Sequence, residues 1–394
     1  MRIRWTPLLT VLLLTTGWTA PPASALDAEH QAKARVAIEQ GLDYLRATQN
    51  PDGSWAPQPG PAITGLVVAA LLDQPDLGPD DPVVARGLQY IMDRAQPDGS
   101  IRDGADGILA NYNTAICLSA LARVHDDPDV AAVIDRAQAF LKDLQWSVGD
   151  VTPEGETVTR DHPFFGGAGY GNSGRPDMSN TQFMLQGLAD SGVDCDDPAF
   201  LNALIFIGRC HGIEANDFFP EGTIVNDGGV IYSTAINRDH TDIPVSYANP
   251  DMVDEARAGR PVSGLRGYGS MTYAAFKSFL YADLDRDDDR VAAALNWIQD
   301  NYTLDQNPGM PESVKLQGLY YYYLTHARAL AAWGATYLDL TDGTRVDWAN
   351  NLIAALVKRQ NEDGSFVNTA SRWMEDNPTL VTAYSVIALQ EASR

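Results

Sequence analysis

A short segment recurs along this chain, and it limits the possible folds more than any other feature of the sequence. Its copies are Q-N-P-D-G-S-W at 49–55, a shorter form Q-P-D-G-S-I at 96–101, and Q-N-E-D-G-S-F at 360–366. Each copy follows an apolar helical pattern, and its Asp-Gly pair is typical of the turn that ends a helix. A segment repeated in this way indicates a chain built from copies of one small unit.

Two further patterns complete the unit. Asp-Asp pairs, most of them followed by Pro, predict helix starts at 80–83, 126–130, 196–199 and 287–291. We expect outer helices near 28–48, 82–95, 128–144, 198–209, 288–301 and 344–359. Thr- and Ala-rich helices follow the turns, and we expect these inner helices at 64–72, 113–124, 180–191, 271–282, 319–333 and 381–392.

Six such pairs predict an all-α fold. Each pair can bury its apolar stripe only against its neighbours, so twelve antiparallel helices close into an α/α toroid. We expect residues 26–394 to form this single domain. The absence of alternating strands and helices excludes a dinucleotide-binding fold.

The first 25 residues have the composition of a secretory signal peptide. Arg2 and Arg4 precede an apolar run at 8–14, and Ala23-Ser24-Ala25 offers a cleavage site before Leu26. A retained membrane anchor is the alternative, but the run is too short to span about 30 Å of hydrocarbon. We therefore expect export to the periplasm or the medium, and no stable membrane span.

Charge and cysteine content narrow the possible partners and cross-links. The chain has 52 acidic and 28 basic residues, a formal net charge of −24. This charge repels nucleic acid, so we expect no nucleic-acid partner. Cys195 and Cys210 flank one expected helix and lie about 22 Å apart along it, too far for a disulfide. With Cys117 inside another helical stretch, we expect three unpaired thiols.

Residues 41–55 match the pattern G-x-x-aromatic-aliphatic-x3-Q-x3-G-x-W in full. Residues 355–366 repeat it with Phe366 for Trp, and residues 87–101 repeat it with a one-residue deletion and Ile101 for Trp. This pattern resembles the QW repeat of squalene-hopene and oxidosqualene cyclases, in the terpenoid cyclase/protein prenyltransferase toroid superfamily (prenyltransferase and squalene oxidase repeat). The resemblance implies an α/α toroid in which the Gln caps a helix and the Trp packs against it. It implies a scaffold and no chemistry of its own.

In the cyclases, a D-x-D-D-T motif supplies the catalytic acid. The literal match at 285–288 opens an expected outer helix, where capping is the expected role. The counterpart in repeat phase is Asp177-Met178-Ser179-Asn180-Thr181, which keeps the first Asp and the Thr but lacks the two later acids. The resemblance therefore leaves Asp177 as the best remaining acid, with Asp227 and His326 as supporting catalytic candidates. Ser179 or Asn180 capping the helix is the alternative.

Metal and cofactor signals are weak. The related prenyltransferases hold zinc with an Asp, a Cys two residues later and a distant His, but Ala115, Val193 and Gly208 precede the three cysteines here. A calcium loop at 283–289 lacks the Gly and Glu that such loops need at positions six and twelve. We expect no cofactor and no metal site.

Two long insertions, at 146–179 and 212–270, join outer helices to inner ones on the same rim. Aromatic and polar residues there and on the inner helices predict a lumen that holds an isoprenoid or another apolar or amphipathic small molecule. Four consecutive tyrosines at 320–323 cannot all face it. Our substrate-binding candidates are Tyr170, Asn180, Tyr232, Tyr273, Tyr322, Trp373 and Tyr384.

Two other functions stay open at this point. Polysaccharide-active enzymes also use such toroids and need two carboxylates across a groove, for which Asp177 with Asp227 or Glu375 is the available pairing. A non-catalytic binding or scaffold protein is the third possibility. Whether the chain is an enzyme is left open by its sequence.

Overall fold

The computed structural model describes residues 26–394 except 59, 105–108, 172–173 and 238–239. The expected signal peptide at 1–25 lies outside these residues. Within them, no helix combines the length and apolar character needed to cross a membrane.

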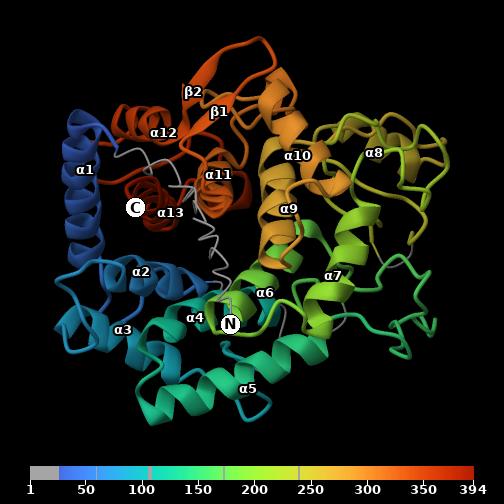
Figure 1. Ribbon diagram of the computed structural model, residues 1–394. Helices are drawn as coiled ribbons and strands as arrows, with labels where there is room; N and C mark the ends of the chain where they lie inside the picture. The colour runs from blue at the N-terminus through green and yellow to red at the C-terminus, as the bar shows by residue number, and fades with distance from the viewer. Residues whose placement is uncertain (1–25, 59, 105–108, 172–173, 238–239) are drawn as a thin grey trace, which may run out of the picture.

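Twelve helices form two concentric rings, as Figure 1 shows. The outer helices are α1 (Ala28–Ala47), α3 (Pro82–Met92), α5 (Pro128–Leu144), α7 (Pro198–Arg209), α10 (Asp289–Asp300) and α12 (Trp348–Val357). The inner helices are α2 (Ala62–Leu72), α4 (Ala110–Leu121), α6 (Met178–Asp190), α9 (Gly269–Tyr281), α11 (Leu319–Trp333) and α13 (Pro378–Ala392). Each inner helix contacts the next, and α13 contacts α2. The expected α/α toroid of six pairs is confirmed.

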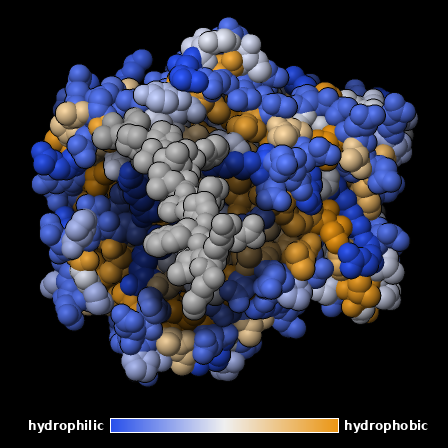
Figure 2. Space-filling view, in the orientation of Figure 1, coloured by the Kyte–Doolittle hydropathy of each residue, from blue (hydrophilic) through white to orange (hydrophobic). Residues whose placement is uncertain are grey.

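The two rings differ in burial, which follows from their sequences. The outer helices bury one apolar stripe; α3, for example, buries Val84, Leu88 and Ile91. The inner helix α2 is buried along nearly its whole length. The inner helices are therefore enclosed by their neighbours in both rings. Hydrophilic residues cover much of the molecular surface in Figure 2.

An aspartate caps the N-terminus of every outer helix in the described chain. The capping residues, whose carboxylates accept hydrogen bonds from first-turn backbone N–H groups, are Asp27, Asp81, Asp127, Asp197, Asp288 and Asp347. Asp288 also pairs with Arg290 at 2.8 Å. The D-x-D-D match at 285–288 therefore contributes a helix cap, as expected from its place in the repeat.

Five of the pairs share one turn between the outer and the inner helix. Its glycines have φ between 81° and 89°, and a Cβ on any of them would lie 2.0–2.3 Å from a carbonyl oxygen of the next outer helix. They are Gly53, Gly99, Gly166, Gly228 and Gly364. Two residues later, a backbone N–H donates to a threonine of the inner helix at 2.9–3.1 Å. These threonines are Thr64, Thr114, Thr181, Thr272 and Thr382.

A side-chain amide fixes this turn to the next outer helix. Gln49 Nε2 donates to the carbonyls of Gly53 and of Val83, and Gln145 and Gln360 make the equivalent pair of bonds. His211 occupies the same position in the fourth pair, with Nε2 2.9 Å from the Gly228 oxygen. The turns after Gln145 and His211 are thus two more copies of the repeat, interrupted by the long insertions.

Some local structure differs from the sequence expectation. A hairpin of β1 (Tyr337–Asp339) and β2 (Arg345–Asp347) occupies part of the expected outer helix at 344–359, which begins only at Trp348. The second insertion contains α8 (Pro250–Arg257), and three short 3-10 helices lie at Ala122–Val124, Glu312–Val314 and Arg372–Met374. All three cysteines are free thiols; Cys117 and Cys210 are buried and Cys195 is exposed.

Candidate binding cavity

A cavity of about 330 Å³ lies at the N-terminal ends of the inner helices. All six inner helices contribute to its wall, mostly with residues of their first two turns. The wall residues are Ala62 and Ile63 of α2, Tyr112 of α4, Ser179 and Phe183 of α6, Ser270 and Met271 of α9, Tyr321 of α11, and Leu380 and Tyr384 of α13. The ring therefore defines the sides of the cavity.

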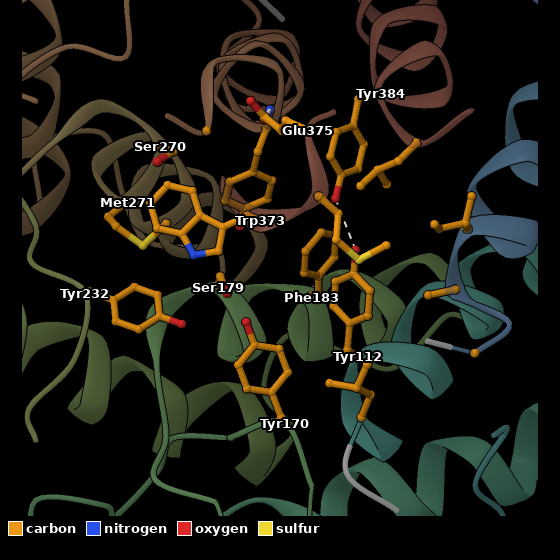
Figure 3. Close-up of a pocket in the computed structure, with 18 of the residues that line it drawn as sticks. Tyr112, Tyr170, Ser179, Phe183, Tyr232, Ser270, Met271, Trp373, Glu375 and Tyr384 are labelled. Carbon is orange, nitrogen blue, oxygen red and sulfur yellow. Dashed lines mark hydrogen bonds between the residues drawn. The ribbon is translucent and has the colours of Figure 1, made fainter. Parts of the chain in front are cut away.

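The insertions and the segment before α13 cover this wall. Tyr170, Tyr232 and Tyr268 come from the two insertions, and Trp373 and its two successors come from the connection between α12 and α13. Figure 3 shows Tyr170, Tyr232 and Trp373 around the same hollow. Both expected insertions thus reach one rim and contribute to one site.

The backbone that carries Trp373 is unusual. Trp373 and Met374 have φ of 57° and 65°, in the left-handed region that non-glycine residues rarely adopt. Gly318, itself at φ 68°, lies against the indole, and a Cβ there would come 3.2 Å from the ring. Strained residues at a ligand site are held by the surrounding packing, and here that packing holds the indole over the cavity.

Eight aromatic side chains line the cavity. They are Tyr112, Tyr170, Phe183, Tyr232, Tyr268, Tyr321, Trp373 and Tyr384. Phe183 links two of them, since its ring lies 5.2 Å edge-on from Tyr112 and 5.7 Å from Tyr321. A surface of this composition suits an apolar chain or a cation.

Few polar groups face the cavity. The hydroxyl groups of Tyr112 and Tyr384 lie 3.1 Å apart (Figure 3). Glu375 is buried, and its carboxylate accepts hydrogen bonds from the Tyr321 backbone N–H at 2.8 Å and from Asn368 Nδ2 at 2.5 Å. Burial raises the pKa of Glu375 to about 7, although these hydrogen bonds oppose the rise.

Asp177 lies directly behind the cavity wall. It caps α6: its Oδ1 accepts hydrogen bonds from the Asn180 backbone N–H and the Ser179 hydroxyl, and its Oδ2 accepts one from Asn180 Nδ2. Burial raises the pKa of Asp177, while the positive charge of Arg175 opposes this. Arg175 lies over the Tyr232 ring, and its buried Nη1 has no hydrogen-bond partner among the described residues.

Asp227 is a turn residue of the fourth repeat. Its Oδ1 accepts a hydrogen bond from the Gly229 backbone N–H at 2.9 Å, as Asp52 and Asp363 do from the serines two residues after them. Asp227 is exposed by its accessible surface, although partial burial of the carboxyl group raises its pKa. Asp227 does not line the cavity.

His326 lies in a separate aromatic cluster between α9, α11 and α12. The rings of Tyr273, Tyr302, Tyr322 and Trp348 surround the imidazole at 5.1–5.9 Å. Neither of its ring nitrogens has a hydrogen-bond partner within the described chain, and burial lowers its pKa to about 3. The cluster contributes nothing to the cavity lining.

The cavity thus contains four of the seven substrate-binding candidates: Tyr170, Tyr232, Trp373 and Tyr384. Asn180 lies behind it with Asp177, and Tyr273 and Tyr322 lie in the His326 cluster. Sequence reasoning did not single out Tyr112 and Phe183. A usable signal was available, because both follow the start of an inner helix by less than two turns.

Comparison with known protein sequences finds similarity over a short stretch of the chain. No family model matches the chain. An 82-residue stretch is 39% identical to a drimenyl diphosphate synthase from Streptomyces showdoensis. This stretch is 20% of the present chain and 15% of that protein, so the likeness spans well under two thirds of the relative.

Comparison of structures covers nearly the whole chain. The α-1,6-mannanase GH76A from Salegentibacter sp. HEL1_6 aligns with a TM-score of 0.54 at 12% identity, over 92% of this chain and 98% of the mannanase. A protein from Actinoplanes aligns with a TM-score of 0.51 at 13% identity, over 92% and 100%. The type II terpene cyclase MstE from Scytonema aligns with a TM-score of 0.36 at 13% identity, over 92% and 98%. The two comparisons with TM-scores above 0.5 and the closed double ring agree that this chain has an α/α toroid fold.

Proposed function

We propose that the protein is terpene cyclase-like and binds an isoprenoid or similar apolar chain in the aromatic cavity. The observation that carries this proposal is the lining of eight aromatic side chains at the converging ends of the inner helices. The local similarity to a drimenyl diphosphate synthase and the QW-type repeats also support a terpene cyclase-like function.

The energetics favour such a ligand. Each methylene group transferred from water into an apolar cavity contributes about 0.8 kcal/mol. The tyrosine and tryptophan faces offer large contact area at small entropic cost, because each ring has only two side-chain torsions. An isoprenoid chain has no hydrogen bonds to lose on entry, so this gain is opposed by few costs.

If the ligand is transformed, Glu375 is our leading proton donor. It lines the cavity, and a pKa of about 7 leaves a large neutral fraction near neutral pH. Asp177 is the second proposed acid, and it would have to act through the Ser179 wall. His326 and Asp227 would have to act from outside the lining, so their catalytic roles have less support.

Glycan processing is the second candidate, and the mannanase-like fold favours it. It needs two carboxylates across a groove. Among the described lining residues, Glu375 is the one carboxylic acid, so the second would have to come from Asp177 behind the wall. We favour the isoprenoid because the cavity has the aromatic lining that such a ligand needs, whereas a glycan-processing site needs a second carboxylate in the lining.

Binding of farnesol, compared with binding of mannotriose, tests the proposal by calorimetry. We expect micromolar affinity for farnesol and none for mannotriose, and an affinity for farnesol about tenfold weaker in Trp373→Ala. Tyr337→Ala removes an exposed ring of the hairpin and should bind like the wild type. Preference for mannotriose would replace the proposal with the glycan alternative.

Export is also part of our proposal, on the strength of residues 1–25. N-terminal sequencing of the protein recovered from its natural producer should begin at Leu26. A mature protein that retains Met1 would contradict cleavage.

A further inference from the structure

A lysine is buried in the lumen of the ring, next to the cavity. Lys277 of α9 is 1% exposed, and its ammonium group donates to Gln182 Oε1 at 2.6 Å and to Gln186 Oε1 at 2.7 Å. No carboxylate of the described residues lies within ion-pair distance of it. Two neutral amides from α6 therefore accept its hydrogen bonds, and burial lowers its pKa well below the usual range.

The orientation of both amides is fixed by their partners. Gln186 Nε2 donates to the Asp190 carboxylate at 2.6 Å, which turns its oxygen toward Lys277. An ammonium group can only donate, so it likewise holds the oxygen of Gln182. The Nε2 of Gln182 must then point away from Lys277, and it lies 2.9 Å from the hydroxyl of Tyr321.

This chain of hydrogen bonds has a consequence for Tyr321. Its hydroxyl oxygen accepts the hydrogen bond from Gln182, so its own O–H hydrogen remains available for donation. Tyr321 lines the cavity. The hydrogen bonds from Lys277 to Gln182 and from Gln182 to Tyr321 reinforce one another and strengthen the tyrosine as a donor.

Several other hydroxyl groups of the wall also have hydrogen-bond partners, among them Ser270, which accepts from Asn307 Nδ2 at 3.2 Å. Ser179 donates to Asp177 at 3.1 Å, and Tyr112 and Tyr384 share a hydrogen bond with each other. In Tyr321 the hydroxyl oxygen accepts from Gln182, and no acceptor for its hydrogen lies among the described residues.

We propose that Tyr321, oriented by Gln182 and Lys277, is a hydrogen-bond donor for the ligand, and that this ligand is an oxygenated isoprenoid with a hydroxyl, ether or carbonyl oxygen reaching α11. The inference rests on the proposed function and specifies its substrate class. A pure hydrocarbon would leave the Tyr321 donor unpaired in an apolar cavity, which carries a cost.

Two ligands of equal chain length test this inference: farnesol, which carries a hydroxyl group, and farnesene, which carries none. We expect the wild type to bind farnesol at least about tenfold more tightly than farnesene, as measured by calorimetry. Tyr321→Phe should abolish this preference while leaving the farnesene affinity within about twofold. Lys277→Met should reduce the preference several-fold, because it removes the hydrogen-bond donor that orients Gln182.

Tyr323→Phe is the matched control. Tyr323 is buried on the same helix, and its hydroxyl donates to the Leu304 backbone oxygen outside the cavity. This variant loses one tyrosine hydroxyl and should keep the wild-type preference.

The outcomes separate the two proposals. Equal wild-type affinities for farnesol and farnesene would overturn the inference and leave the proposed function standing. A preference that survives in Tyr321→Phe would also overturn it. Failure of the wild type to bind either ligand would overturn the proposed function, and the inference with it. The wild-type comparison uses no variant, so it tests the inference even if the Tyr321→Phe protein does not fold.

Discussion

Lys277 and His326 are both buried on inner helices, and their surroundings differ. Lys277 donates to two glutamine side chains, whereas the His326 ring lies among four aromatic rings and has no hydrogen-bond partner in the described part of the chain. Burial lowers the pKa of His326 to about 3, so the folded protein keeps this ring neutral above that pH. The unfolded chain, with an ordinary histidine pKa near 6.5, takes up a proton much earlier.

This difference predicts acid sensitivity that His326→Phe should relieve. The stabilising contribution of a neutral His326 is complete above about pH 6.5 and is lost as the pH falls toward 3, because the unfolded state binds the extra proton. Between pH 6.5 and 5 the loss is about 2 kcal/mol. We expect His326→Phe to lose about 2 kcal/mol less than the wild type over this interval, measured by urea unfolding at both pH values.

Glu375 and other titrating groups are common to both proteins, so their contributions cancel in this comparison. Exposed His125→Gln is the control and should follow the wild type. Equal losses in His326→Phe and the wild type would contradict a neutral His326.

The site residues were harder to predict from the sequence than the helices, because neighbouring residues on one helix have different surroundings. Tyr321 and Tyr322 are neighbours on one helix, yet Tyr321 lines the cavity and the hydroxyl of Tyr322 donates to the Thr303 backbone oxygen. Successive residues on a helix point about 100° apart, so choosing between them needs the helix rotation. Rotation depends on packing against both neighbouring helices, which no local pattern of this chain reveals.

At the scale of elements, the turn is the unit that repeats most faithfully. It combines a left-handed glycine, a side chain that reaches the next outer helix, and an inner-helix threonine. Gln49 reaches its glycine carbonyl across 4 residues, whereas Gln145 and His211 do so across 21 and 17. The helices were predictable from their caps and apolar stripes. These two turns were not, because the insertions separate partners that the fold brings together.

Substitution of the turn glycine should disrupt the repeat. In Gly228→Ala, the new Cβ would meet the Ala293 carbonyl oxygen at 2.2 Å with φ at 83°. We expect a loss of about 3 kcal/mol or more in the free energy of unfolding, because both the backbone strain and the clash must be relieved.

Gly222→Ala isolates the strain. Gly222 has φ 80°, and no atom lies within 4 Å of the position that a Cβ would occupy, so its substitution should cost about 1 kcal/mol. Equal losses at the two glycines, measured by chemical denaturation, would show that contact with α10 contributes nothing.

For the whole molecule, closure of the ring depends on joining the last inner helix to the first. Gln390 Nε2 of α13 donates to the Ala70 carbonyl of α2 at 2.7 Å. Asp73, at the C-terminal end of α2, accepts from Arg123 at 2.8 and 3.0 Å and from Arg394 at 3.1 Å. One nearly buried carboxylate therefore connects α2 to residues that follow α4 and α13.

Asp73→Asn should weaken this closure. We expect a loss of about 1–2 kcal/mol in the free energy of unfolding, because the mostly buried Arg123 loses its anion, while the half-exposed Arg394 adds little. Asp339→Asn breaks the exposed pair with Arg345 and should cost less than about 0.5 kcal/mol. Similar losses in the two variants, measured by urea unfolding, would contradict a special role for Asp73.

The two rims of the toroid are built differently, and this has an evolutionary consequence. Both long insertions, the Trp373 segment and the repeated turns lie on the rim that covers the cavity, whereas the aspartate caps of the outer helices lie at the opposite rim. Selection for a new ligand can act on the inserted segments, whereas the turns, caps and inner-helix contacts must be kept for folding. Because the inner helices also supply part of the cavity wall, substitutions there change ligand specificity and folding together.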